Sequence, residues 1–253
     1  YVPPGKKQWG ENAYEQTADI LKFFSEYTGF RYPWNEFRQV AVQDFIYGGM
    51  ENTGAVVLFE GSVYDEKTEP DYNATNLVAH ELAHQWWGDV VTCKNWNEIW
   101  LNESFATYFQ CLYTEHLMGK DEFDYNIYRN GNDAIKADST NRKPIYIREG
   151  LTTNTYDKGS VVLNMLRYLV GDENFRKTMN IYITKNQFKP VVTKDLADAL
   201  HTAIDDPLLD RMPANMSWFF EEWIYKAGQP EFRVEYSFNE KNNELTLTAV
   251  QVQ

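Results

Sequence analysis

Apolar residues near the start of the chain recur at the spacing of a helix. A stripe with one apolar side chain every three or four residues lies on one helical face, and glycine commonly follows the end of a helix. Gly29 follows the segment from Asn12 to Tyr27. The pattern therefore predicts a helix that ends before Gly29. Its apolar positions are Ala18, Leu21, Phe24 and Tyr27.

The pattern then alternates before it becomes helical again. Residues 38–47 alternate apolar and polar side chains, which predicts a β-strand, and residues 54–60 ("GAVVLFE") are interpreted as another strand. From Asp71 onward, helical spacing dominates, and Gly88, Gly119 and Gly171 stand at expected helix ends. The expected helices cover residues 73–87, 97–118, 121–137, 156–170, 172–186, 193–204 and 215–227.

The C-terminal stretch returns to strand-like alternation. After Pro230, "EFRVEYSFNEKNNELTLTAVQV" contains two alternating runs around an Asn-rich turn, which predicts a hairpin. This change suggests that residues 231–253 begin a separate, truncated β domain. The expected fold class is α+β, with a small mixed sheet followed by a mainly helical lobe in a domain that spans residues 1–230.

Composition supports a folded chain and excludes some partners. The chain has 253 residues, of which 43% are hydrophobic and 16% aromatic, so a sizeable core is expected. No apolar run approaches the roughly 18–20 residues that span a bilayer, so no transmembrane segment is expected. The net charge of -13 argues against nucleic acid as a partner. Cys93 and Cys111 are expected to be buried free thiols.

The N-terminal segment has no feature that assigns a compartment. "YVPPGKKQWGENAYEQ" has neither an initiator Met nor an apolar stretch of signal-peptide type. We therefore expect that the segment follows a cut within a longer protein. Any targeting segment would then lie upstream, and the localisation stays unknown.

Two of the chain's four histidines suggest a metal site. His80 and His84 are four residues apart, so on a helix their side chains share one face, and Glu81 lies beside the first of them. In this H-E-x-x-H pattern, two imidazoles hold Zn²⁺ and the glutamate acts as general base. The alternative is a helix with two surface histidines and no metal.

A catalytic zinc site needs a third protein ligand. Glu103 falls in the second turn of the helix expected over residues 97–118, and two helices folded back on each other would bring it to the histidines. The neighbouring Glu98 and Asn102 are assigned no role, since both could be solvated. His116 and His201 have no partner at ligand spacing and are expected to be structural.

Three motifs together resemble those of peptidase family M1, the gluzincin aminopeptidases. They are the zinc signature "HELAHQWWGDVVT...WLNESFA", the segment "YGGMENTG" and the segment "TYDKGSVVLNML". The resemblance implies a thermolysin-like catalytic domain, followed by the first strands of a β-sandwich. It also implies one Zn²⁺ held by His80, His84 and Glu103, with Glu81 as general base. Tyr156 would stabilise the oxyanion.

The Gly-x-Met-Glu-Asn motif is expected to bind the substrate. Glycines let a peptide backbone approach closely, and a carboxylate beside them can pair with a free α-ammonium group. Glu51 would supply this carboxylate, and the alternative is a solvated loop glutamate. Tyr47 is expected either to line the pocket for the first side chain or simply to pack. The implied substrate-binding residues are Tyr47, Gly48, Gly49, Met50, Glu51 and Asn52.

The leading hypothesis is a zinc-dependent aminopeptidase that hydrolyses the N-terminal peptide bond of peptides with a free N-terminus. A zinc endopeptidase would share the metal site but would not need Glu51. A zinc-binding scaffold with little turnover is the third reading. Two departures from the family are Ser104, where glycine is commoner, and the absence of the family's N-terminal β domain. The chain is thus expected to be flanked by further domains.

Overall fold

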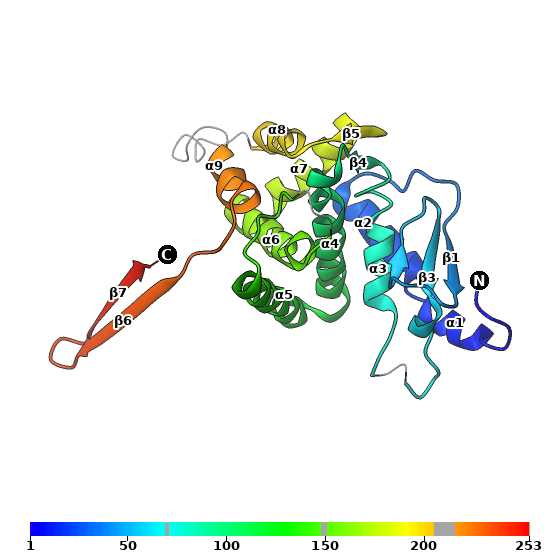
Figure 1. Cartoon of the computed structure of the whole chain (residues 1–253), viewed down its shortest axis with the longest axis horizontal. Coiled ribbons are helices and arrows are strands. Elements are labelled where there is room, and N and C mark those ends of the chain that lie inside the picture. Colours follow the sequence, from blue (N-terminus) through cyan, green and yellow to red (C-terminus); the bar gives the residue numbers. More distant parts are fainter. Residues whose placement is uncertain (69–70, 148–150, 205–215, 253) are drawn as a thin grey trace.

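A buried central helix organises the fold. The computed structural model describes residues 1–68, 71–147, 151–204 and 216–252. In helix α4 (Trp100–Met118), almost every side chain from Trp100 to Thr114 is buried. A helix buried on all sides has other elements packed around it, and α3, α5 and α6 all contact α4. The core therefore surrounds α4 (Figure 1).

Helices account for about half of the chain. No helix of the described residues is long and apolar enough to cross a bilayer. The helices are α1 (Lys7–Ala13), α2 (Thr17–Thr28), η1 (Glu60–Ser62), α3 (Thr75–Ala83), η2 (Trp96–Glu98), α4 (Trp100–Met118), α5 (Lys120–Thr140), η3 (Asn154–Lys158), α6 (Gly159–Val170), α7 (Asp172–Asn186), α8 (Thr193–Ala203), α9 (Ser217–Phe220) and η5 (Glu221–Tyr225).

Three small sheets complete the fold of the described residues. The first sheet has the strand order β1-β3-β2, in which β3 is parallel to β1 and antiparallel to β2. Strands β4 and β5 form a second, parallel pair, and β6 and β7 form an antiparallel hairpin. The strands are β1 (Arg38–Val42), β2 (Gly49–Met50), β3 (Ala55–Phe59), β4 (Val91–Cys93), β5 (Lys189–Val191), β6 (Phe232–Asn239) and β7 (Glu244–Gln251).

The architecture agrees with a mixed α and β fold that is mostly helical, but several expected boundaries were wrong. The single helix expected from Asn12 is two helices, α1 and α2. The strand expected over 38–47 ends at Val42, because Asp44 has a positive φ of 56°, which takes the backbone out of the extended region. The alternation pattern missed the short strands β2, β4 and β5.

Other differences concern the ends of helices. The helix expected over 73–87 ends at Ala83, where the N–H groups of Gln85 and Trp86 bond to carbonyls three residues back and tighten the chain. The helix expected from residue 97 is a 3₁₀ turn followed by α4. The helix expected over 156–170 begins with the π-helical turn η3, and the one over 215–227 contains only α9 and η5, with residue 215 outside the described residues.

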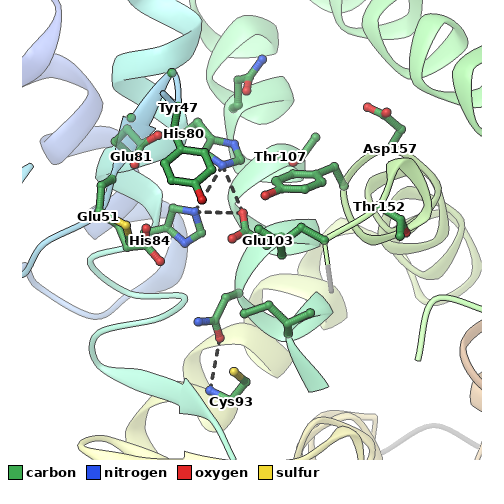
Figure 2. A pocket seen from close by; sticks show the side chains of 18 of the residues that line it. Tyr47, Glu51, His80, Glu81, His84, Cys93, Glu103, Thr107, Thr152 and Asp157 are labelled. Atoms are coloured by element: carbon green, nitrogen blue, oxygen red, sulfur yellow. Dashed lines mark hydrogen bonds and ion pairs between the residues drawn. The ribbon is translucent and has the colours of Figure 1, made fainter. Parts of the chain in front are cut away.

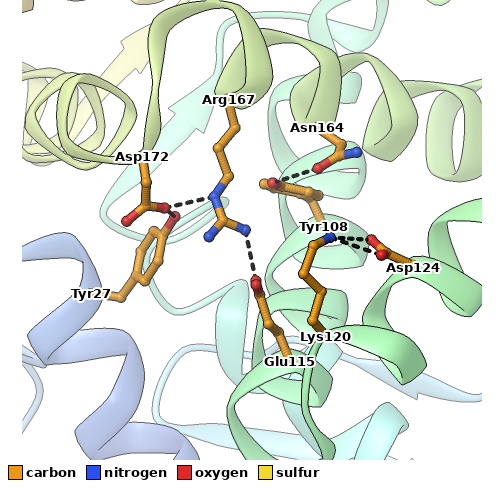
Figure 3. Close-up of polar contacts among 8 residues, drawn as sticks. All are labelled: Tyr27, Tyr108, Glu115, Lys120, Asp124, Asn164, Arg167 and Asp172. Atoms are coloured by element: carbon orange, nitrogen blue, oxygen red, sulfur yellow. Dashed lines mark hydrogen bonds and ion pairs between the residues drawn. The ribbon is translucent and has the colours of Figure 1, made fainter.

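A charged cluster ties the helices around α4 together (Figure 3). The Arg167 guanidinium lies 2.7 Å from Glu115 Oε2 and 2.6 Å from Asp172 Oδ1. The Tyr27 hydroxyl donates to the same Asp172 oxygen at 3.2 Å. Because these four residues come from α4, α6, α7 and α2, the cluster cross-links the lobe that supports the central helix.

The predicted hairpin is present and extends away from the helical lobe (Figure 1). All side chains of β6 and β7 are exposed. Alternation and register place most of the apolar side chains on one face of the hairpin. These residues, which we call the apolar hairpin face, are Phe232, Val234, Tyr236, Phe238, Leu245 and Leu247.

Candidate active site

A cavity of about 1240 Å³ lies between the first sheet and the helical lobe. Strand β2 and helix α3 supply lining residues from one side, and α4 and η3 supply them from the other. Figure 2 shows the side chains of His80, His84 and Glu103 converging within it. Every residue that the sequence motifs singled out lines this cavity, except Asn52.

The three expected metal ligands form a nearly equilateral triangle. His80 Nε2 lies 3.2 Å from His84 Nε2, and Glu103 Oε2 lies 3.4 Å from His80 Nε2 and 3.3 Å from His84 Nε2. His80 lies on α3 and His84 directly follows its last residue. Glu103 lies in the first turn of α4, because the helix starts three residues later than expected.

These distances and donors fit a zinc ion. Ligand atoms about 2.0–2.1 Å from a tetrahedral Zn²⁺ lie about 3.3–3.4 Å from one another. Two imidazole nitrogens and one carboxylate oxygen also make up a donor set that catalytic zinc sites use, with a fourth position open. The triangle of His80, His84 and Glu103 therefore meets both the geometric and the chemical requirement for zinc.

The backbone orients the second histidine. His84 Nδ1 lies 2.9 Å from the Trp87 carbonyl oxygen, and that oxygen can only accept a hydrogen bond. In the neutral ring the proton therefore belongs on Nδ1, which leaves Nε2 free to face the cavity as a ligand atom. The tight turn after α3 thus determines how His84 is presented.

The buried triad holds its charges through mutual contacts. Burial raises the pKa of Glu103, but hydrogen bonds to His80 and His84 outweigh it and lower that pKa to about 2. Burial lowers the pKa of His84, but the hydrogen bond and charge of Glu103 outweigh it and raise the pKa to about 10. For His80, burial prevails and lowers the pKa. Without metal, His84 and Glu103 therefore form an ion pair.

Glu81 is buried beside the triad. Its pKa is raised to about 8, mainly by burial and further by the charges of Glu51 and Glu103. Gly49 of β2 lies directly against it, since a Cβ at Gly49 would come 2.6 Å from Glu81 Cγ and still closer to the carboxyl group. The position next to Glu81 therefore has room for glycine and not for a larger residue.

Glu51 follows the edge strand β2 and faces the triad. Carboxylate and ring atoms of Glu51, Glu81 and His84 lie within 4.8 Å of one another. In the strand order β1-β3-β2, β2 is an edge strand. Gly48 and Gly49, at the start of this strand, line the cavity. A carboxylate and a sheet edge therefore meet at the same end of the cavity.

The two tyrosines lie in different settings. Tyr156 is half-buried on η3, and its ring stacks 6.1 Å from the His80 ring. Its pKa is raised by burial and by the negative charges of Glu103 and Glu51, so the hydroxyl stays protonated at neutral pH. Tyr47 lines the cavity, is 60% exposed and has its ring 6.0 Å from the Phe45 ring.

Sequence reasoning missed several lining residues, and it left Glu98 and Asn102 without a role because both could be solvated. Glu98 and Asn102 are buried and not solvated. Glu98 accepts hydrogen bonds from Thr193, and Asn102 Oδ1 accepts from the Cys93 backbone N–H. Several polar lining residues lie outside the quoted motifs, because they come from separate elements. Among them are Thr107, Gln110, Asn130 and Thr152.

The remaining histidines and the cysteines lie as follows. His116 is half-exposed, stacks 4.5 Å from Phe23 and pairs with Asp19, which agrees with a structural role. His201 is exposed on α8. Both cysteines are free, as expected, but only Cys111 is buried, while Cys93 is partly exposed at the cavity wall.

Comparison with known proteins identifies the family. Residues 12–223 match the model of the peptidase family M1 domain. The chain is 34% identical to aminopeptidase N of Rattus norvegicus over 91% of its own length and 26% of the relative. It is 30% identical to a leucyl aminopeptidase of Saccharolobus solfataricus, over 92% of the chain and 30% of the relative.

A third relative gives the same result over a shorter stretch. Endoplasmic reticulum aminopeptidase 2 of Bos taurus is 34% identical over 79% of the chain and 22% of the relative. The chain thus spans less than a third of the length of these three relatives. The match over residues 12–223 nevertheless covers most of the chain, and the three motifs lie in one cavity. The chain therefore belongs to peptidase family M1.

Proposed function

We propose that this chain is the catalytic part of a zinc-dependent aminopeptidase. The observation that carries the proposal is the triangle of His80, His84 and Glu103, whose ligand atoms lie 3.2–3.4 Å apart and have Glu81 and Glu51 beside them. The three relatives named above are aminopeptidases, which supports the same reaction class. The substrates would be peptides with a free N-terminus.

Each residue of the cavity has a distinct part in the proposed reaction. Zn²⁺ at the triad would act as a Lewis acid toward the peptide carbonyl and the attacking water. Glu51 pairs with the α-ammonium group, while the backbone of Gly48 and Gly49 accommodates the first residue. Glu81 takes the proton of the water and delivers it to the leaving amine. The protonated Tyr156 hydroxyl donates a hydrogen bond to the oxygen that becomes negative.

The position of Glu51 favours an aminopeptidase over an endopeptidase. An endopeptidase must accommodate peptide on both sides of the scissile bond, and a carboxylate close to the zinc ligands would obstruct one side. In this cavity, Glu51 lies within 4.8 Å of Glu81 and His84. A purely structural zinc site would prefer four protein ligands, whereas this triad provides three.

The fold assignment extends this proposal. We infer that residues 1–230 form a thermolysin-like domain, because the metal ligands lie at the junction of α3 and α4, between a small sheet and a helical lobe. We also infer that residues 231–253 begin a β-sandwich domain. The exposed apolar hairpin face supports this, since further strands would bury it. Other domains of the same protein would be its neighbours.

Hydrolysis of aminoacyl-arylamides tests the proposed function. The zinc-loaded protein and its Glu81→Gln variant are compared on free-amine substrates and on the same substrates with an N-acetyl group. We expect hydrolysis of the free-amine substrates only, lost in Glu81→Gln with zinc still bound. Cleavage of acetylated substrates would indicate an endopeptidase instead. Zinc binding without turnover would indicate a scaffold or a site completed by other domains.

A further inference from the structure

Gln85 joins the zinc motif to the loop that carries Glu51. It directly follows His84 and is fully buried. Its side-chain Nε2 donates a hydrogen bond to the Glu51 carbonyl oxygen at 3.2 Å. Its Oε1 accepts a hydrogen bond from the Gly54 N–H at 2.8 Å. Both ends of the amide are thus used by the loop between β2 and β3.

The Gln85 amide takes the place of a direct hydrogen bond within this loop. A carbonyl and an N–H three residues apart would pair with each other in a β-turn. Here the Glu51 carbonyl and the Gly54 N–H have that separation, and the amide bonds to both of them. Ala55 N–H closes the adjacent turn on the Asn52 carbonyl at 2.9 Å. The Gln85 amide therefore lies between the Glu51 carbonyl and the Gly54 N–H, and its two hydrogen bonds determine the shape of the loop.

The same segment contacts the loop at a second point. The carboxyl group of Asp89, four residues after Gln85, lies beside the Thr53 side chain. Trp86 and Trp87, which lie between them, are fully buried. The chain that follows His84 is therefore held rigidly in the core while its polar side chains reach residues 51–54. Movement of this loop relative to the metal ligands would break the two hydrogen bonds of Gln85.

The link between Gln85 and the Glu51 loop matters because the amine and the reacting carbonyl of an N-terminal residue are close together. In an N-terminal residue, only one Cα separates the α-ammonium group from the carbonyl that reacts. A site that holds both must therefore fix the separation of Glu51 and the metal triad closely. Gln85 is adjacent to the ligand His84 and bonds to the backbone of Glu51 itself.

We propose that Gln85 is a positioning residue that holds Glu51 at the correct distance from the metal triad. It thereby determines the preference for a free N-terminal amine. The proposal rests on the aminopeptidase function proposed above. If Gln85 had a purely structural role, its loss would weaken the binding of all ligands alike or lower the zinc content. If it has a positioning role, its loss weakens the binding of ligands that carry a free amine.

The test uses two substitutions of Gln85 and one matched control. Gln85→Met keeps the length of the side chain and removes both hydrogen bonds. Gln85→Glu keeps the acceptor for Gly54 N–H and removes the donor to Glu51. Gln39→Glu on β1 is the control, because Gln39 Oε1 accepts from Thr17 outside the cavity. Zinc content and thermal unfolding are measured for each zinc-loaded protein.

Two readouts separate binding of the amine from the rest of the reaction. The first is kcat and KM for leucine arylamide. The second is calorimetric binding of leucinamide and of N-acetyl-leucinamide, measured in the Glu81→Gln background so that leucinamide is not hydrolysed during the titration. With zinc content unchanged, we expect Gln85→Met to raise KM and the leucinamide Kd about tenfold, the effect of one lost buried hydrogen bond or slightly more. The expected changes in kcat and in binding of N-acetyl-leucinamide are small.

The outcomes distinguish this proposal from the proposed function. If the wild type prefers leucinamide and both Gln85 variants retain its KM and Kd, the positioning role is wrong. An equal loss for the free and acetylated ligands would also overturn it, in favour of a structural role. If the wild type itself does not distinguish the two ligands, the proposed aminopeptidase function fails, and the role of Gln85 fails with it.

Discussion

At the scale of single residues, the metal triad is held by charge as well as by geometry. The contacts of Glu103 lower its own pKa to about 2 and raise that of His84 to about 10. Trp87 provides the carbonyl that orients the His84 ring. Contacts among the three side chains therefore help to hold their ligand atoms close together.

The ion pair of His84 and Glu103 predicts that zinc binding releases a proton. The raised pKa of His84 keeps the ring protonated between pH 6 and 8 in the metal-free protein, and only a neutral imidazole can bind the metal. Zinc affinity must then increase as the pH rises. We expect the apparent zinc Kd to fall about tenfold per pH unit across this range.

Calorimetry in buffers of different ionisation enthalpy measures this release directly. The heat of zinc binding should change linearly with the ionisation enthalpy of the buffer, with a slope that corresponds to about one proton or more released per zinc ion. His116→Gln is a matched control, since His116 is half-exposed and is not among the residues that line the cavity. It should leave the proton release unchanged. A zinc affinity that stays constant from pH 6 to 8 would contradict the protonated state of His84.

At the scale of secondary structure elements, α4 and η3 meet at a very close contact. The Ser104 hydroxyl donates a 2.6 Å hydrogen bond to the Thr155 carbonyl, next to Tyr156. A Cβ at Gly159, the first residue of α6 directly after η3, would overlap the Ser104 side chain. Glycine is commoner in the family at the position of Ser104. The serine fits here because Gly159 has no side chain that would meet it. The Ser104 hydroxyl also adds a hydrogen bond between the segments that carry Glu103 and Tyr156.

A double-mutant cycle tests this contact. Gly159→Ala should destabilise the protein by roughly 1–3 kcal/mol, because the added methyl group overpacks a buried helix contact. Ser104→Gly removes the group that the methyl would meet, so the double variant should be more stable than the sum of the two single effects predicts. We expect a coupling energy of about 1 kcal/mol in urea unfolding.

The stability of an unrelated glycine variant serves as the reference for this cycle. Gly131 lies within α5 and a Cβ there would contact nothing within 4 Å. Gly131→Ala should therefore be neutral or stabilising, since alanine is a better helix former. Strict additivity of Ser104→Gly and Gly159→Ala would show that the two side chains do not meet.

At the scale of the whole molecule, the described chain divides into a packed body and a projecting hairpin. The hairpin is exposed along both strands, and it lies apart from the helical lobe (Figure 1). An ion pair of 3.4 Å links Arg142 with Glu231 at the base of the hairpin, and both side chains are more than half exposed. Exposed pairs of this kind stabilise a fold by only about 0–1 kcal/mol.

Removal of residues 231–253 should therefore leave the body nearly unchanged. We expect the melting temperature to shift by less than about 4 °C, and zinc binding to be retained. Binding of a hydrophobic dye should decrease, because the apolar hairpin face is removed. A matched full-length variant with Val234→Thr and Leu247→Thr reduces the apolar area of the same face, so it should also bind less dye. A large loss of stability in the truncated protein would show that the hairpin belongs to the core of the body.

Much of the fold and of the candidate site could be predicted because it follows local rules. The helices around α4, the hairpin after Pro230 and the i, i+4 pair of His80 and His84 follow from periodicity. The errors lie where tertiary contacts override it. The helix of His80 ends early to form the turn that orients His84, and Tyr156 lies on a π-helical turn. Such adjustments depend on packing partners distant in sequence.

The amino-acid sequence by itself determined the types of chemical group, their local spacing and the motifs typical of the family. Only the tertiary structure decided how the separate segments meet. It brings Glu103 to within 3.4 Å of both histidines and Gly49 against Glu81, and it connects Gln85 to the backbone of Glu51. The physical reason is that periodicity reports which face of an element is buried, whereas the partner of that face depends on how the whole core packs.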